Sequence, residues 1–140
     1  MTLLEENAKK VEKVAKNVIK EYKSANLSAV SIVLPISGVP IFHQAKKNDS
    51  EKNIISALAA GAMQTGDFVA NRMGYSVTQE MDLVIRGEVG HTVFKRIRCL
   101  TGPVPEEFVI LATNDDNTQI ALTSRFVSYL GKEIIKNILE

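Results

Sequence analysis

The segment from Glu51 to Met73 carries two apolar seams, although a small domain needs only one seam to cover a sheet. Side chains that recur at three- and four-residue spacing lie on one face of a helix. The first seam consists of Ile55, Leu58, Ala62, Thr65 and Val69. The second seam, on the adjacent face, consists of Ala59, Met63, Gly66, Ala70 and Met73. Its small residues favour a close-packed partner helix, most simply from a second copy. The alternative is a broad helix buried within its own domain.

Length and charge exclude several classes of protein. We expect one domain over residues 1–140, because this length is typical of a single domain with its own core. The formal net charge of +1 argues against a nucleic-acid partner. The single cysteine, Cys99, cannot form an internal disulfide, which favours a reducing compartment. With no signal-peptide pattern and no apolar run of about 20 residues, we expect a cytoplasmic protein without membrane insertion.

The periodicity predicts an α+β fold with the order α-β-β-α-β-β-β-α. An amphipathic helix should occupy residues 1–24, and the core should span residues 27–139. Alternating or branched runs predict strands at residues 27–34, 39–44, 79–86, 91–98 and 108–113. The last helix has apolar residues four apart, from Leu122 to Ile138. Short hairpin-like connections favour a single five-stranded antiparallel sheet with helices on its faces.

No pattern of residues predicts catalysis or metal binding. His91 and Cys99 would lie roughly 26 Å apart on one extended strand, too far to form a dyad. His43 is expected to be solvated or locally bonded, because widely separated ligands make a poor metal site. Asp115 and Asp116 precede a helix, so they are better explained as caps than as paired catalytic acids. No phosphate-binding glycine motif is present, and we expect neither a cofactor nor a catalytic residue.

The basic run KRIR, Lys95 to Arg98, is the strongest cluster of positive charge in the sequence. On a strand, Arg96 and Arg98 share one face with Phe94, while Lys95 and Ile97 share the other. Such a face could contact RNA, with the aromatic ring available for stacking. The near-neutral net charge favours instead a solvated strand face or contacts with the acids of a protein partner.

Four segments resemble the roadblock / dynein light chain domain family. They are SGVPIF (37–42), IISALAAGAMQTGDFVANRMG (54–74), QEMDLVIRGE (79–88) and FVILATNDDNTQIALTSRFVSYLGKEIIKNIL (108–139). The similarity covers residues 27–139, and the leading helix resembles the first helix of many members. It rests on a pattern of elements and contains no catalytic signature.

This resemblance implies a dimer, formed with a second copy or with another roadblock-type chain. In the family, the second helices pack together and the third strands pair into one continuous sheet. The predicted interface therefore comprises Ala59, Met63, Gly66, Ala70, Met73, Met81, Asp82, Leu83, Val84 and Ile85. An edge strand with free backbone groups is a natural template for such pairing.

The resemblance also implies a function, since the family's members are generally not enzymes. They are scaffolds or regulators that bind small Ras-like GTPases, or light chains of dynein motors. No motif identifies an activating arginine, so five arginines stay open: Arg72, Arg86, Arg96, Arg98 and Arg125. The alternative is a profilin-, longin- or PAS-like module that binds a small molecule or a protein, which would need a pocket with convergent polar groups.

Overall fold

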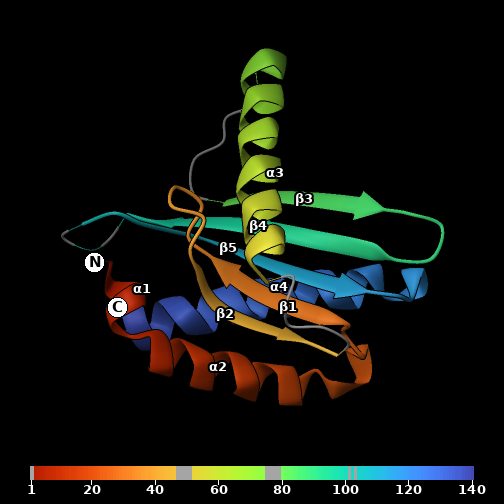
Figure 1. Cartoon of the computed structure of the whole chain (residues 1–140), viewed down its shortest axis with the longest axis horizontal. Helices are drawn as coiled ribbons and strands as arrows, with labels where there is room; N and C mark the ends of the chain where they lie inside the picture. The colour runs from red at the N-terminus through yellow and green to blue at the C-terminus, as the bar shows by residue number, and fades with distance from the viewer. Residues whose placement is uncertain (1, 47–51, 75–79, 101, 103) are drawn as a thin grey trace.

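The fold is built on one five-stranded antiparallel sheet (Figure 1). The structure is a computed structural model that describes residues 2–46, 52–74, 80–100, 102 and 104–140, without the side chains of residues 52–57. The strands are β1 (Ala29–Val33), β2 (Pro40–Ala45), β3 (Glu80–Arg86), β4 (His91–Cys99) and β5 (Glu106–Asn114). Their order across the sheet is β2-β1-β5-β4-β3. Strands β2 and β3 are therefore the two edges. The sheet confirms the predicted fold class, while predicted strand residue Gln79 lies outside the described residues.

The helices are α1 (Leu3–Glu6), α2 (Ala8–Glu21), α3 (Lys52–Met73) and α4 (Ile120–Ile134). Short turns of other helix types follow α2 (η1, Lys23–Ala25), precede α4 (η3, Asn117–Gln119) and extend it (η4, Ile135–Leu139). The expected continuous first helix is wrong at one point, because Asn7 separates α1 from α2. Asn7 departs from helical dihedral angles, with φ −109° and ψ 27°. Its side-chain amide and its backbone N–H both donate to the Leu3 carbonyl, at 2.8 and 3.0 Å.

The sheet is covered on both faces, and each face has its own apolar core. Helices α2 and α4 lie on one face, where Val11, Val18, Phe126 and Leu130 join the large core cluster. Helix α3 lies on the other face, where Ala59 and Met63 pack with the smaller cluster of Val33, Phe94, Val109 and Leu111. Alternation along the strands sends neighbouring residues into different cores. In Figure 1, α3 runs across the strands and its C-terminal end projects beyond β3.

Helix α4 approaches the sheet closely because Gly131 has no side chain. A Cβ atom at this position would lie 2.3 Å from Cδ1 of Ile97 on β4. Central strand β5 pairs with β1 on one side and with β4 on the other. Helix α4 covers one face of β5 and α3 covers the other, so Phe108–Ala112 is buried on both faces. Among the described helices, none is both long and apolar enough to cross a membrane.

Candidate interaction surface

Part of the α3 face that was assigned to a partner packs on the chain's own sheet instead. Of the second seam, Ala59, Met63 and Ala70 are buried within the chain, and Ala59 and Met63 pack on its own sheet. The first seam faces outward instead, since Leu58 is 64% exposed and Val69 is 51% exposed. Both seams are apolar and adjacent, so periodicity alone could not decide which one covers the sheet. The side chain of Ile55 lies outside the described residues.

An apolar groove of about 520 Å³ lies between α3 and edge strand β3, and residues of the outward seam line it. Its lining residues from α3 are Ala62, Thr65, Gly66, Val69 and Ala70, and those from β3 are Met81, Asp82, Leu83 and Ile85. Six of these nine residues belong to the predicted interface. At the floor, a Cβ atom on Gly66 would lie 2.9 Å from Cε of Met81, so glycine allows helix and strand to approach closely.

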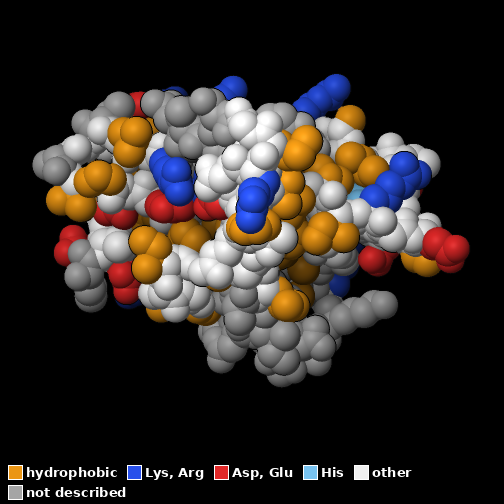
Figure 2. Space-filling model, turned by 90° about the horizontal axis from the view of Figure 1, so that it is seen from above, with side chains coloured by type: hydrophobic (Ala, Val, Ile, Leu, Met, Phe, Trp, Pro, Cys, Tyr) orange, Lys and Arg blue, Asp and Glu red, His pale blue; other side chains and the backbone are white. Residues whose placement is uncertain are grey.

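Strand β3 presents an uncovered apolar edge next to this groove. It pairs with β4 alone, over Glu80–Arg86, so its other side lacks a neighbouring strand in the described part of the chain. Val84 and Ile85 are exposed, and Met73 at the end of α3 is exposed as well. Hydrophobic side chains are visible across this side of the molecule, seen from above in Figure 2. An exposed strand edge beside an apolar groove is suited to protein pairing.

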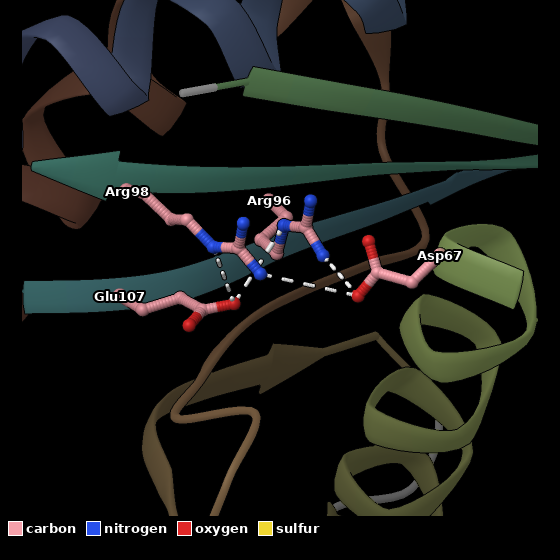
Figure 3. Close-up of polar contacts among 4 residues, drawn as sticks. All are labelled: Asp67, Arg96, Arg98 and Glu107. Atoms are coloured by element: carbon pink, nitrogen blue, oxygen red, sulfur yellow. Dashed lines mark hydrogen bonds and ion pairs between the residues drawn. The ribbon is translucent and has the colours of Figure 1, made fainter. Parts of the chain in front are cut away.

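Ion pairs join α3 to the sheet through Asp67 (Figure 3). Asp67 of α3 accepts a hydrogen bond from Nη1 of Arg96 at 2.5 Å. Glu107 of β5 lies 3.6 Å from Nε of Arg96 and 3.5 Å from Nε of Arg98. Arg96 is 1% exposed, and its Nη2 atom is buried without a hydrogen-bond partner among the described residues. These contacts fix the orientation of α3 about its own axis.

Lys95 points to the other face of β4 and is also neutralised within the chain. Its Nζ atom lies 3.0 Å from Asp82 and 3.3 Å from Glu80, both on β3. Burial acts to lower the pKa of Lys95, but these two carboxylates outweigh burial and raise it above the usual value. The expectation that KRIR forms a solvated face or contacts a partner is therefore wrong for Lys95 and Arg96. The sequence did not reveal that their partners lie on three other elements.

The five open arginines differ in how freely they could reach a partner. Arg96 is buried and paired, and Arg98 lies within ion-pair range of Asp67 and Glu107. The Arg72 guanidinium lies 5.3 Å from the centre of the exposed Phe68 ring, on α3. The remaining two are exposed at opposite places, Arg86 at the end of β3 and Arg125 on α4. Arg72 and Arg86 are the exposed pair nearest to the groove in sequence.

The two histidines form hydrogen bonds within the chain, and the cysteine lies at one end of β4. His91 and Cys99 lie at opposite ends of β4, as the sequence predicted. Nε2 of His91 lies 2.8 Å from Oγ1 of Thr123, and Nδ1 lies 3.2 Å from Oδ1 of Asn117. Nδ1 of His43 lies 2.6 Å from Oγ of Ser31, so His43 is locally bonded.

The predicted capping role is confirmed for Asp116. Its carboxylate accepts from the Thr118 amide at 2.9 Å, at the start of the turn that leads into α4. Hydrogen bonds from the Thr118 hydroxyl and amide hold the pKa of Asp116 below its usual value.

Comparison with known proteins places this architecture among solved structures. No family model matches the chain, and no curated protein does. Myxococcus xanthus MglB superimposes with a TM-score of 0.70 at 17% identity, over 94% of this chain and 90% of that one. The chain has the fold of MglB. The gliding protein MglB from Thermus thermophilus gives a TM-score of 0.66 at 13% identity, over 90% of this chain and 89% of that one.

A third MglB structure, which has a tetrameric arrangement, gives a TM-score of 0.63 at 14% identity, over 90% of this chain and 91% of that one. MglB is a roadblock-domain protein, so the fold expected from the sequence resemblance is confirmed.

Proposed function

We propose that this chain is a dimeric, non-enzymatic regulator or scaffold that binds a small Ras-like GTPase in the cytoplasm. One observation carries the proposal: on an MglB-like fold, an exposed apolar seam of α3 adjoins the uncovered edge of β3. The groove between them has the composition of a protein interface, with few charges at its centre. The MglB structure with a tetrameric arrangement adds support for self-association.

In the proposed dimer, α3 packs on α3 of a second copy and β3 pairs with β3. The α3 contribution shifts from the buried Ala59 and Met63 to the outward side chains of Leu58, Thr65 and Val69. Gly66 and Ala70 keep a place in it because they line the groove. Strand residues Met81 to Ile85 keep the role that the sequence assigned to them. The burial of the apolar side chains of α3 and β3 would drive association of the two copies, with a gain of about 25 cal/mol per Å² of apolar area removed from water.

Charge placed in the seam tests the dimer. Val69→Glu should give a monomer of 15.4 kDa, since the carboxylate would be buried against the partner's apolar groove. Phe68→Glu is the matched control, because Phe68 is 60% exposed on the outer face of the same helix and does not line the groove. Light scattering of the unmodified chain and the Phe68 variant should give about twice the chain mass. A monomeric parent chain, or dimers for both variants, would contradict this interface.

Nucleotide-dependent capture tests the GTPase partner. The immobilised chain should recover a small GTPase from native lysate, with different yields in excess GDP and in excess GTPγS. Only a protein that binds the two nucleotide states with different affinity can shift the GTPase cycle. Mass spectrometry identifies the captured protein, and the Val69→Glu monomer shows whether capture needs the dimer. Recovery of RNA in place of a GTPase would overturn the proposal.

A further inference from the structure

A second groove, of about 600 Å³, lies at the other edge of the sheet, between the end of α2 and strands β1 and β2. Its apolar lining includes the buried Val30 and the partly buried Ile19, Tyr22 and Leu27. The Tyr22 ring is fixed in place because it packs edge-on against Phe126, with centroids 5.6 Å apart. The volume falls in the range of small-molecule sites, about 300–1,000 Å³.

Three lysines from three different elements converge on this groove. Lys20 comes from the last turn of α2, Lys23 from η1 and Lys46 from the residue after β2. The Lys46 ammonium donates to Oδ1 of Asn26, another lining residue, which has a positive φ of 53°. None of the described lining residues is a carboxylate, and no described carboxylate lies in ion-pair range of the three lysines.

Cations elsewhere in the described chain are either paired with a carboxylate or exposed without a described ion pair, as Lys9, Arg86 and Arg125 are. Three lysines of the second kind line this one groove. Lys95, Arg96 and Arg98 each have a carboxylate in ion-pair range, and Lys16 pairs with Glu12 at 2.8 Å. Lys20 also complements the negative end of the α2 dipole, but Lys46, at the end of a strand, has no such structural reason. Ammonium groups without a described carboxylate partner, beside an apolar wall, match a ligand with an anionic head and an apolar chain.

We propose that this groove binds an amphiphile whose head is a carboxylate or a phosphate. The chain of the amphiphile would lie against Ile19, Leu27 and Val30, and its head would contact Lys20, Lys23 and Lys46. The groove adjoins edge strand β2, whereas the proposed dimer surface adjoins edge strand β3. The two sites can therefore be occupied together, and either can fail without the other. A soluble fatty acid and an anionic membrane lipid both supply this chemistry.

Octanoate and 1-octanol separate the contribution of the head from that of the chain. In titrations followed by amide NMR signals of the ¹⁵N-labelled chain, octanoate should shift the signals of Asn26, Ser28 and Lys46. Octanol, with the same chain length and no charge, should shift them at much higher concentration. The proposal would be overturned if octanoate and octanol shifted these signals at the same concentration, or if octanoate did not shift them.

Charge reversal of the three lysines tests the head site directly. The triple variant Lys20→Glu, Lys23→Glu, Lys46→Glu should bind octanoate at least about tenfold more weakly. The matched control Lys9→Glu, Lys10→Glu, Lys13→Glu makes the same charge change on exposed positions of α2 that do not line the groove. Equal octanoate affinity for the two triple variants would contradict the site, provided that urea unfolding shows both to be folded.

Vesicle co-sedimentation identifies the source of the amphiphile. Binding to phosphatidylglycerol vesicles, absent with phosphatidylcholine and lost in the groove triple variant, would support the site with a membrane lipid as its ligand. Octanoate binding without vesicle binding would support the site with a soluble amphiphile as its ligand. Vesicle binding that the control triple variant loses and the groove variant retains would overturn the proposal.

Discussion

Replacing Asp67 with alanine would leave the buried Arg96 guanidinium with Glu107 as its one described carboxylate neighbour. Breaking a buried ion pair costs about 3–5 kcal/mol when the remaining charge is wholly uncompensated. Here Glu107 remains 3.6 Å from Nε of Arg96, and the Asp67 side chain is itself 37% exposed. Both facts reduce the loss, so we expect Asp67→Ala to lower the free energy of unfolding by about 2 kcal/mol. For a chain of this length, that corresponds to a decrease in Tm of about 6 °C.

The partner variant should be less harmful, and this asymmetry is the sharper expectation. Arg96→Met removes the buried charge together with the ion pair, and it keeps an unbranched side chain in the space. Asp67 and Glu107 are partly exposed and keep Arg98 nearby, so neither is left as a buried charge. We expect a cost of about 1 kcal/mol. The double variant should then be more stable than Asp67→Ala alone, because the second substitution removes the charge that the first one stranded.

Urea unfolding at one fixed protein concentration measures all three variants, with Asp115→Ala as a control for the loss of an exposed aspartate. The control should change the free energy of unfolding by less than about 0.5 kcal/mol. A double variant that is less stable than Asp67→Ala would refute the reasoning. It would show that the pair stabilises the fold through attraction, with no penalty from a stranded charge.

Three further predictions concern other parts of the fold. Gly131→Ala should lower the free energy of unfolding by about 1–3 kcal/mol, and Ile97→Val, which removes the obstructing Cδ1 atom, should recover part of that loss in urea unfolding. Asn117→Ala should lose about 1–2 kcal/mol and raise amide exchange in the hairpin, because Nδ2 of Asn117 donates to the Gly87 carbonyl at 2.8 Å. The Tyr129 phenol should titrate near pH 12 by ultraviolet absorbance, since the hydrogen bond to Glu133 and burial raise its pKa to about 12. The protonated phenol therefore stabilises the folded state. This stabilisation is fully present below the unfolded pKa of 10.0 and is lost as pH rises through 12.

Alternation and helical periodicity were sufficient to predict the sheet, because each depends on residues close together in sequence. The stripe on residues 1–24 became the buried face of α2, with Val11, Ala15 and Val18 at its centre. The break at Asn7 was missed because it lies in the dihedral angles of one residue, whose backbone hydrogen bond to the Leu3 carbonyl is still made. Sequence spacing describes which residues share a face, and it says little about the dihedral angles of a single residue.

The sequence did not predict which apolar seam of α3 packs on the sheet, because that choice also involves charged residues on other elements. Two adjacent seams of α3 had the same period, so apolar content did not distinguish them. One contact that holds α3 in the observed rotation is the ion pair from Asp67 to Arg96 on β4. That pairing joins residues 29 apart in sequence, so no local pattern contains it.

With the Asp67 side of α3 attached to the sheet, Ala59 and Met63 stay inward, and Leu58 and Val69 stay outward. The ion pairs at Asp67 thus decide which apolar surface a partner meets. Loss of these ion pairs should weaken the proposed dimer even though no partner touches them. Light scattering of Asp67→Ala at decreasing concentration measures this coupling. A dimer as tight as that of the unmodified chain would show that groove packing alone holds α3 in place.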